Sequence, residues 1–270
     1  MKAVAIDLDG TLLNSKHQIS SYTKNILNKL DKNGIRIVLA SARPIRSVLN
    51  IAAEIGLTGL PMIGGNGAII AKNENEISYR NSISKDDVLK IGELLKEYLS
   101  LNPKNEITMH IYSGFKWLIP FHTEKAKEEI KIIGFSPDVI GEDAFKANLA
   151  EKIMFVSNPN ILKEFLNILN KNLPHLSSVL SKFDSLEINA VGVSKFLGVQ
   201  EYANYHKINI SDFIAFGDGD NDETMIANCG YGVAMANGTQ LAKARAKFIT
   251  ETNDNDGVAR FLENYFFKSK

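Results

Sequence analysis

Short apolar segments that alternate with amphipathic ones constrain the fold of this chain most strongly. The segments 2–8, 35–40 and 212–217 are rich in Ala, Val, Ile and Phe, as is typical of buried strands. The segments 21–34 and 194–208 have the pattern of helices, with apolar residues at helical spacing. Buried strands that alternate with helices predict a parallel sheet covered on both faces. We therefore predict an α/β fold with a doubly wound, Rossmann-like core.

The middle of the chain follows a different order. A predicted helix at 84–100 precedes two predicted strands, 106–113 and 116–121, that pair across Gly114. Strands that meet through hairpins, with helices interspersed, are typical of an α+β module. The sequence therefore predicts a core interrupted by an α+β cap domain, with the core at 1–82 and 184–270 and the cap at 83–183.

The charge balance and the cysteine content exclude several classes of protein. Among the 270 residues, 31 Lys and Arg balance 31 Asp and Glu, so no net positive field attracts nucleic acid or an anionic membrane. The single cysteine, Cys229, allows no internal disulfide and suits a reducing compartment. No targeting signal and no apolar run of membrane-spanning length is visible. We expect a cytoplasmic monomer or small homo-oligomer without nucleic-acid or membrane partners.

Two aspartates follow directly on the first predicted strand. Asp7 and Asp9 lie in the sequence DLDGT, separated by a single leucine. Removing a carboxylate from water is unfavourable, and two close carboxylates repel each other. Side chains two residues apart on an extended backbone lie on the same side. The pair therefore requires a positive charge between or beside its carboxylates.

Other polar residues also follow predicted strands or begin helices. Ser41 follows the second strand, and Asp218, Asn221 and Asp222 follow the last one. Lys195 falls in the first turn of a helix, where backbone N–H groups and the helix dipole favour an anion. Because the carboxyl ends of parallel strands lie along one edge of a sheet, where ligands usually bind, we expect one common site.

These residue types suit a phosphate ester and a small divalent cation. A few carboxylate ligands favour Mg²⁺, which keeps waters and shares its coordination shell with substrate phosphate. Asp7 can attack the phosphorus atom, while Lys195 neutralises charge on the transferring oxygens. Asp9 can protonate the leaving oxygen and then activate the hydrolytic water. We predict Mg²⁺-dependent hydrolysis of a small phosphorylated metabolite, a sugar phosphate or a related compound, through a phospho-aspartate.

Four ordered motifs resemble those of a known superfamily. DLDGTLL, ASARP, the helix at Lys195 and GDGDND look like the motifs of haloacid-dehalogenase-like phosphatases, and more narrowly of the Cof-type branch with its large cap. The segments NGA and GYGVAMANGTQLAKARAKFITETNDNDGVARFL are also similar to this family. The resemblance implies that Asp7 is the nucleophile and that Mg²⁺ binds Asp7, the backbone carbonyl of Asp9, Asp218 and, directly or through a neighbour, Asp222. It implies that phosphate and substrate are bound by Leu8, Ser41, Ala42, Asn66, Lys195 and Asn221.

Two positions depart from the family pattern, and two other functions stay open. Ser41-Ala42-Arg43 stands where Thr-Gly-Arg is usual, and Phe196 stands where glycine is common. A hydroxyl and a backbone N–H for phosphate are retained. The alternatives are a phosphosugar mutase with the same chemistry and a non-enzymatic phospho-acceptor module. Locally, Asn66 suits either a turn of positive φ or a substrate contact, and Ser41 suits a helix N-cap.

Overall fold

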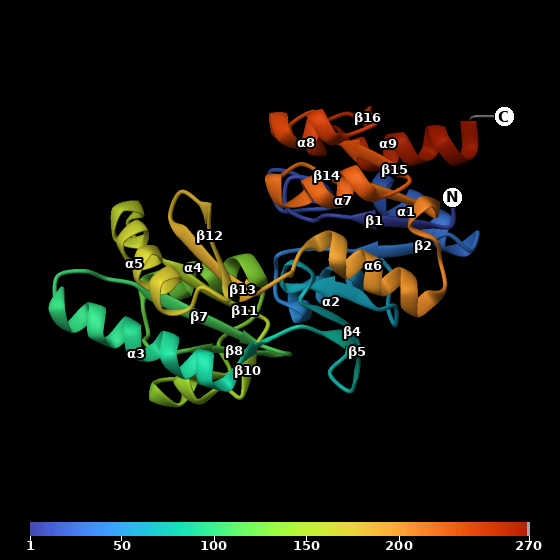
Figure 1. Cartoon of the computed structure of the whole chain (residues 1–270). Helices are drawn as coiled ribbons and strands as arrows, with labels where there is room; N and C mark the ends of the chain where they lie inside the picture. The colour runs from blue at the N-terminus through green and yellow to red at the C-terminus, as the bar shows by residue number, and fades with distance from the viewer. Residues whose placement is uncertain (269–270) are drawn as a thin grey trace. The chain divides into compact units, whose positions relative to one another are not determined.

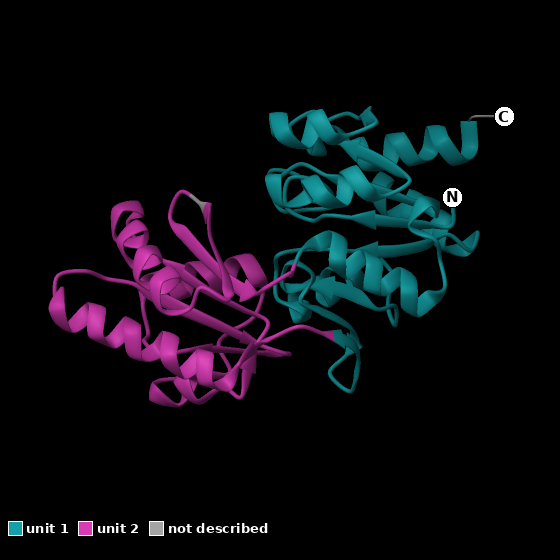
Figure 2. Cartoon of the chain, viewed as in Figure 1, with its two compact units in different colours: residues 1–79, 194–270 teal, residues 80–193 magenta. Residues whose placement is uncertain are grey.

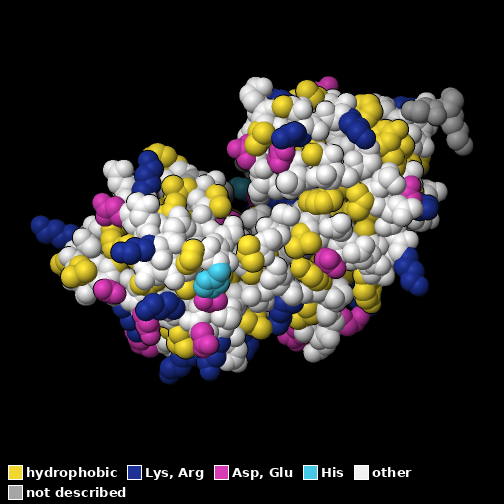
Figure 3. Space-filling model, in the orientation of Figure 1, with side chains coloured by type: hydrophobic (Ala, Val, Ile, Leu, Met, Phe, Trp, Pro, Cys, Tyr) yellow, Lys and Arg dark blue, Asp and Glu magenta, His cyan; other side chains and the backbone are white. Residues whose placement is uncertain are grey.

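The computed structural model describes residues 1–268, apart from the side chain of Lys182. The chain forms two compact units (Figure 2). We call them the core unit, Met1–Tyr79 with the segment from Ser194 onward, and the inserted unit, Arg80–Val193. On the face shown in Figure 3, basic and acidic side chains are interspersed over each unit, in agreement with the balanced charge of the sequence.

The core unit is built on a five-stranded parallel sheet with the strand order β16-β15-β14-β1-β2 (Figure 1). β1 pairs with β2 on one side and with β14 on the other, so the chain order reverses beside β1. Ligands of α/β proteins bind at the carboxyl ends of strands near such a reversal. The predicted doubly wound core is confirmed. The strands are β1 Ala3–Ile6, β2 Arg36–Leu39, β14 Phe213–Gly217, β15 Tyr231–Ala234 and β16 Phe248–Ile249.

Helices connect these strands and cover the sheet. The connections from β1 to β2 and from β14 to β15 run in opposite directions along the sheet. Because such connections are right-handed as a rule, α1 and α7 belong to opposite faces. α1 packs against α9, and α7 packs against α6 and α8. No helix in the described part of the chain has the length and apolar character needed to cross a membrane. The helices are α1 Ser21–Lys32, α2 Ile45–Glu54, α6 Lys195–His206, α7 Glu223–Asn228, α8 Gln240–Arg245 and α9 Gly257–Glu263.

Two smaller features complete the core unit. A three-stranded sheet follows α2 and consists of β3 Met62–Gly64, β4 Ile69–Asn73 and β5 Glu76–Arg80. The single-turn helix η1 Gly65–Gly67 lies one residue before β4, and η4 Asp220–Asp222 lies directly before α7. Both carry residues that the sequence places in the site.

The inserted unit contains a six-stranded sheet with the order β12-β13-β11-β7-β8-β9. All pairs in it are antiparallel except β8 with β9. The predicted hairpin across Gly114 is confirmed, because β7 pairs with β8 and Gly114 has a φ of +60°. The strands are β7 Thr108–Ser113, β8 Lys116–Ile119, β9 Val139–Ile140, β11 Lys152–Val156, β12 Leu176–Lys182 and β13 Ser185–Ala190, with a two-stranded sheet of β6 Ile83–Ser84 and β10 Leu149–Ala150; the helices are α3 Lys85–Leu101, α4 Glu124–Ile133 and α5 Pro159–Asn172.

The boundaries of the inserted unit differ from those expected at 83–183. The compact unit runs from Arg80 to Val193, so its second end lies beyond the expected residue 183. The reason is β13, which pairs with both β11 and β12 and buries Leu186 and Ile188 in the sheet of the inserted unit. Apolar residues that alternate with polar ones predict a strand, but they do not indicate which sheet the strand joins. Residues 269 and 270 of the expected core lie outside the described residues.

A histidine is enclosed in the inserted unit without polar partners. His110, on β7, has no exposed surface, and neither ring nitrogen has a hydrogen-bond partner among the described residues. Its ring stacks on that of Trp117 at a centroid distance of 5.6 Å. Burial, with a smaller contribution from the charge of Lys152, lowers the pKa of His110 from 6.5 to about 3. The neutral imidazole is therefore the form that the folded protein accommodates.

This burial predicts that the inserted unit loses stability in acid. Between pH 6.5 and about 3 the unfolded chain binds a proton at His110 that the folded chain rejects, so stability falls as pH falls through this window. From pH 7 to pH 4 the loss from His110 is about 3 kcal/mol. His110→Phe keeps the ring stack and should remove this part of the pH dependence. Urea unfolding followed by the fluorescence of Trp117, the single tryptophan, measures the difference.

The control is His122→Phe, at an exposed position of the same unit. It should leave the pH dependence of the unfolding free energy as in the wild type. Equal acid sensitivity of wild type and His110→Phe would show that His110 is not responsible.

Candidate active site

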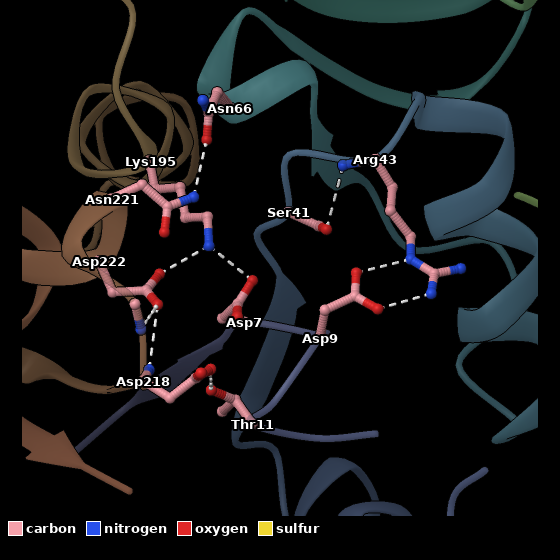
Figure 4. Close-up of polar contacts among 11 residues, drawn as sticks. Asp7, Asp9, Thr11, Ser41, Arg43, Asn66, Lys195, Asp218, Asn221 and Asp222 are labelled. Carbon is pink, nitrogen blue, oxygen red and sulfur yellow. Dashed lines mark hydrogen bonds and ion pairs between the residues drawn. The ribbon is translucent and has the colours of Figure 1, made fainter. Parts of the chain in front are cut away.

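The predicted polar residues meet at the carboxyl edge of the core sheet. Asp7 directly follows β1 and Asp218 directly follows β14, while β1 and β14 are neighbours in the sheet. Asp222 ends η4, and Lys195 is the first residue of α6. Figure 4 shows these four side chains turned toward one another. The expectation that these segments converge is thus met by the geometry of the core unit.

Lys195 forms the centre of the cluster. Its Nζ atom lies 2.6 Å from Asp7 Oδ1 and 2.7 Å from Asp222 Oδ1, and the lysine side chain is only 2% exposed (Figure 4). Burial alone would lower the pKa of Lys195, but the attraction of Asp222 and Asp7 outweighs it and raises the pKa. The lysine is therefore a permanent cation at neutral pH. It supplies the positive charge that the Asp7 carboxylate requires.

Close backbone packing fixes the start of α6 and hence Lys195. Ser194 is the N-cap of α6, and its hydroxyl oxygen accepts from the N–H of Leu197 at 3.1 Å. A Cβ atom on Gly67 would lie 2.0 Å from the carbonyl oxygen of Ser194, and one on Gly198 would lie 2.9 Å from Gly67 Cα. Both positions therefore require glycine, because larger residues would push α6 away from the η1 loop. The glycine pair brings the lysine to the sheet edge.

Backbone amides hold Asp222, the other carboxylate that pairs with Lys195. Asp222 Oδ2 accepts from the N–H groups of Asp218 and Gly219 at 3.0 and 2.9 Å. Asp218 Oδ1 accepts from the hydroxyl of Thr11 at 2.7 Å. Each carboxylate is thereby fixed in orientation by groups that do not neutralise its charge. Thr11 was not among the predicted site residues.

Asp7, Asp218 and Asp222 fit a small divalent cation. Each offers one carboxylate oxygen, and these oxygens lie within 4.8 Å of one another. Burial, with repulsion from Asp222, raises the pKa of Asp7 well above its usual value, and burial also raises the pKa of Asp218. One lysine balances only one of the three charges. Oδ2 of Asp7 and Oδ2 of Asp218 accept no hydrogen bond from the described residues, which leaves oxygen ligands of the kind that Mg²⁺ prefers.

The carboxylate of Asp9 lies apart from this cluster. It pairs side-on with Arg43, with Nε to Oδ2 at 2.7 Å and Nη2 to Oδ1 at 2.6 Å, and Figure 4 shows it directed toward Arg43. His17 Nδ1 lies 3.5 Å from Asp9 Oδ1. The side chain of Arg43 is 9% exposed and that of Asp9 is 40% exposed. This two-bond pair directs the Asp9 carboxylate to Arg43 and not to the acidic cluster.

The residues expected to bind phosphate and substrate occupy different surroundings. Asn66 has a φ of +66°, as a left-handed turn requires, and its Oδ1 accepts from Asn221 Nδ2 at 3.2 Å. The Ser41 hydroxyl accepts from the N–H of Arg43 at 3.2 Å. The N-cap of α2 is Pro44, so Ser41 is not the N-cap of that helix. Ala42 lies in the same turn between β2 and α2.

Leu8 can contribute to the site only through its backbone. Its side chain has no exposed surface and belongs to the core. Its carbonyl oxygen accepts from the N–H groups of Leu12 and Leu13 at 3.0 and 2.8 Å, which folds the loop after β1 into a tight turn.

Two neighbours of the site, Thr11 and Arg43, were quoted in the sequence motifs without a role. Two neighbouring aspartates require a cation nearby, so the sequence indicates that a residue such as Arg43 should be present. It does not identify which cation pairs with Asp9, because Arg43 lies 34 positions away along the chain.

Comparisons with known proteins agree with this arrangement. A model of the haloacid dehalogenase-like hydrolases matches residues 4–262, so the chain belongs to that family. A Haemophilus influenzae protein with the word phosphatase in its name is 31% identical over 268 residues, 98% of each chain. The 5-amino-6-(5-phospho-D-ribitylamino)uracil phosphatase YitU of Bacillus subtilis is 28% identical over 97% of each chain. The protein is thus an enzyme, a phosphoric monoester hydrolase.

A solved structure extends the agreement to the whole fold. The crystal structure of a haloacid dehalogenase-like hydrolase from Bacteroides thetaiotaomicron is 28% identical to this chain. The two superpose with a TM-score of 0.87 over 98% of this chain and 99% of the other. The resemblance seen in the four motifs is confirmed at the level of the family.

Proposed function

We propose that the enzyme hydrolyses small phosphate monoesters with Mg²⁺ through a phospho-aspartate on Asp7. The observation that carries this proposal is the buried pair of Asp7 with Lys195, at 2.6 Å and beside Asp218 and Asp222. A carboxylate held between a fixed cation and a cation site can approach an anionic phosphate without full charge repulsion. If the pair of Asp7 with Lys195 were purely structural, the negative charge of the other two aspartates would have no explanation.

The chain's own residues account for both halves of the reaction. Asp7 forms a bond to phosphorus while the bond from phosphorus to the ester oxygen breaks, and Asp9 gives a proton to the departing oxygen. Water then attacks the phosphorus, loses a proton to Asp9 and releases phosphate with the Asp7 carboxylate restored. Lys195 neutralises the phosphate charge throughout.

We assign the cation to Asp7, Asp218 and Asp222, with the backbone carbonyl of Asp9 as a further ligand. When bound there, Mg²⁺ supplies Lewis-acid neutralisation of the phosphate oxygens. Ser41, Ala42, Asn66 and Asn221, with the backbone of Leu8, are proposed to hold phosphate and substrate. The pair of Asn221 with Asn66 supports this, because it joins two loops that border the lysine.

The relatives and the chemistry of the site support a class of substrate. YitU is named for a substrate with a phosphorylated ribityl group. We propose a sugar phosphate or a related small phosphorylated metabolite, with Arg80–Val193 acting as the cap domain. The haloacid dehalogenase-like hydrolase family and the phosphatase relatives favour hydrolysis over the mutase and phospho-acceptor alternatives.

Phosphate release from p-nitrophenyl phosphate and a panel of sugar and polyol phosphates tests the proposal. We expect turnover with Mg²⁺, its loss in EDTA and its recovery when Mg²⁺ is returned in excess, because three clustered carboxylates, two of them buried, require a cation. Turnover that persists in EDTA would contradict the assigned cation. Interconversion of a sugar phosphate that requires a sugar bisphosphate would identify a mutase.

A further inference from the structure

The C-terminal segment of the core unit holds the loop that follows the nucleophile. Asn237 Nδ2 donates to the carbonyl oxygen of Gly10 at 2.8 Å, and Asn253 Nδ2 donates to that of Leu13 at 2.9 Å. The two asparagines are joined, because Asn237 Oδ1 accepts from the N–H of Asn253 at 3.0 Å. We call Asn237 and Asn253 the asparagine clamp. Both asparagines lie more than two hundred positions along the chain from the residues 10–13 that they contact.

The clamped loop borders the acidic cluster directly. Gly10 has a φ of +83°, and a Cβ atom there would lie 2.3 Å from Asp218 Oδ2. The next residue, Thr11, donates its hydroxyl to Asp218 Oδ1 at 2.7 Å. The preceding residue is Asp9, the proposed acid and base. A shift of the Gly10 carbonyl therefore moves Asp9 and Asp218 relative to each other.

The same segment also holds Asp218 from its other side. The N–H of Thr239 donates to the carbonyl oxygen of Asp218 at 2.8 Å, and the Thr239 hydroxyl donates to Asp220 at 2.7 Å. The turn 237–239 thus contacts both the loop after β1 and the loop after β14. Asn237 itself is exposed. Substitution at an exposed position costs little stability, so this hydrogen bond is better placed to set geometry than to hold the fold.

We propose that Asn237 and Asn253 are positioning residues, which hold Asp9 and Thr11 at the distance from Asp218 that the proposed phosphoryl transfer requires. This inference rests on the proposed function. Asn237 and Asn253 thereby gain a role, although they take no part in the proposed reaction steps. Neither residue touches the reacting atoms.

The kinetic test compares two leaving groups. In Asn237→Ala, Asn253→Ala and the double variant, kcat for an alkyl ester, glycerol phosphate, should fall at least about tenfold more than kcat for p-nitrophenyl phosphate. The alkyl leaving group needs a well-placed proton donor, whereas the nitrophenolate does not. Loss of folded protein would lower both rates by the same factor. Asn33→Ala is the control, because Asn33 makes the same kind of bond, to Lys29 O at 2.7 Å, far along α1.

Hydrogen exchange gives a second measurement that needs no turnover. The backbone amides of Thr11, Leu12 and Leu13, which bond within the loop, should exchange at least about tenfold faster in the clamp variants and unchanged in Asn33→Ala. Equal losses on both esters, or unchanged exchange, would overturn the clamp. A wild-type protein inactive on every ester would overturn the proposed function instead, and the exchange rates alone would then decide whether the clamp positions the loop.

Discussion

Asp7→Asn abolishes phosphate release, with kcat expected to fall by at least about 10³-fold while KM can no longer be measured reliably. The amide lacks the charge and the nucleophilic oxygen that form the bond to phosphorus. The fold should persist, because the asparagine has the same shape and Asp222 continues to pair with Lys195 at 2.7 Å. Steady-state phosphate release and circular dichroism on the same preparation measure both parts of this expectation.

The control for Asp7→Asn is Asp143→Asn. Asp143 is an exposed aspartate paired with Lys146 at 2.7 Å in the inserted unit, and its loss should leave kcat unchanged. Acid-quenched wild-type protein should carry phosphate on an aspartate, and Asp7→Asn should carry none. A folded Asp7→Asn protein that keeps normal turnover would rule out the covalent mechanism.

Lys195→Met has the second largest expected effect and acts on both activity and stability. Methionine fills the same buried volume but leaves Asp7 and Asp222 facing each other without their shared cation. Breaking a buried ion pair from one side typically costs about 3–5 kcal/mol, and we expect a loss of this order in the unfolding free energy without metal. We expect kcat to fall by about 10²–10³-fold, as for other groups that stabilise transition-state charge.

Urea unfolding in EDTA and turnover in Mg²⁺ separate the two effects of Lys195→Met. Lys2→Met is the matched control, because Lys2 pairs with Asp212 at 3.0 Å but is 69% exposed. It should change neither quantity measurably. Normal kcat in Lys195→Met would show that the lysine serves the fold alone.

The core and most of its site were predictable from the sequence because local signals mark them. The segment is apolar from Ala3 to Ile6 and then reaches Asp7, so it predicts both a buried strand and the place where the strand ends. The same holds for Phe213–Gly217 and Asp218. Parallel strands then bring such ends to one edge whatever the details of packing. For this reason Asp7, Lys195, Asp218 and Asp222 could be grouped without any coordinates.

Other features depend on contacts between distant segments. The pairing of Asp9 with Arg43 could not be read from the sequence, because a carboxylate two residues from Asp7 suits the acidic cluster equally well. The expected boundary at 183 left Ser185–Ala190 with the core, whereas β13 pairs with β11 and β12 in the inserted unit, and the reason is similar. Its alternating pattern, with Leu186 and Ile188 buried, fits any half-buried antiparallel strand.

The α/β core, the family and the residues proposed to carry the chemistry could be predicted from the sequence alone, because these predictions depend on local hydrophobic pattern and on short motifs. The tertiary structure was needed to show which charges share a partner: Lys195 joins Asp7 to Asp222, while Arg43 draws Asp9 away from them. It also decided that Asn237 and Asn253 hold the loop after β1. Hydrogen bonds and ion pairs act over about 3 Å in space, and no local pattern records which distant residues come within that range.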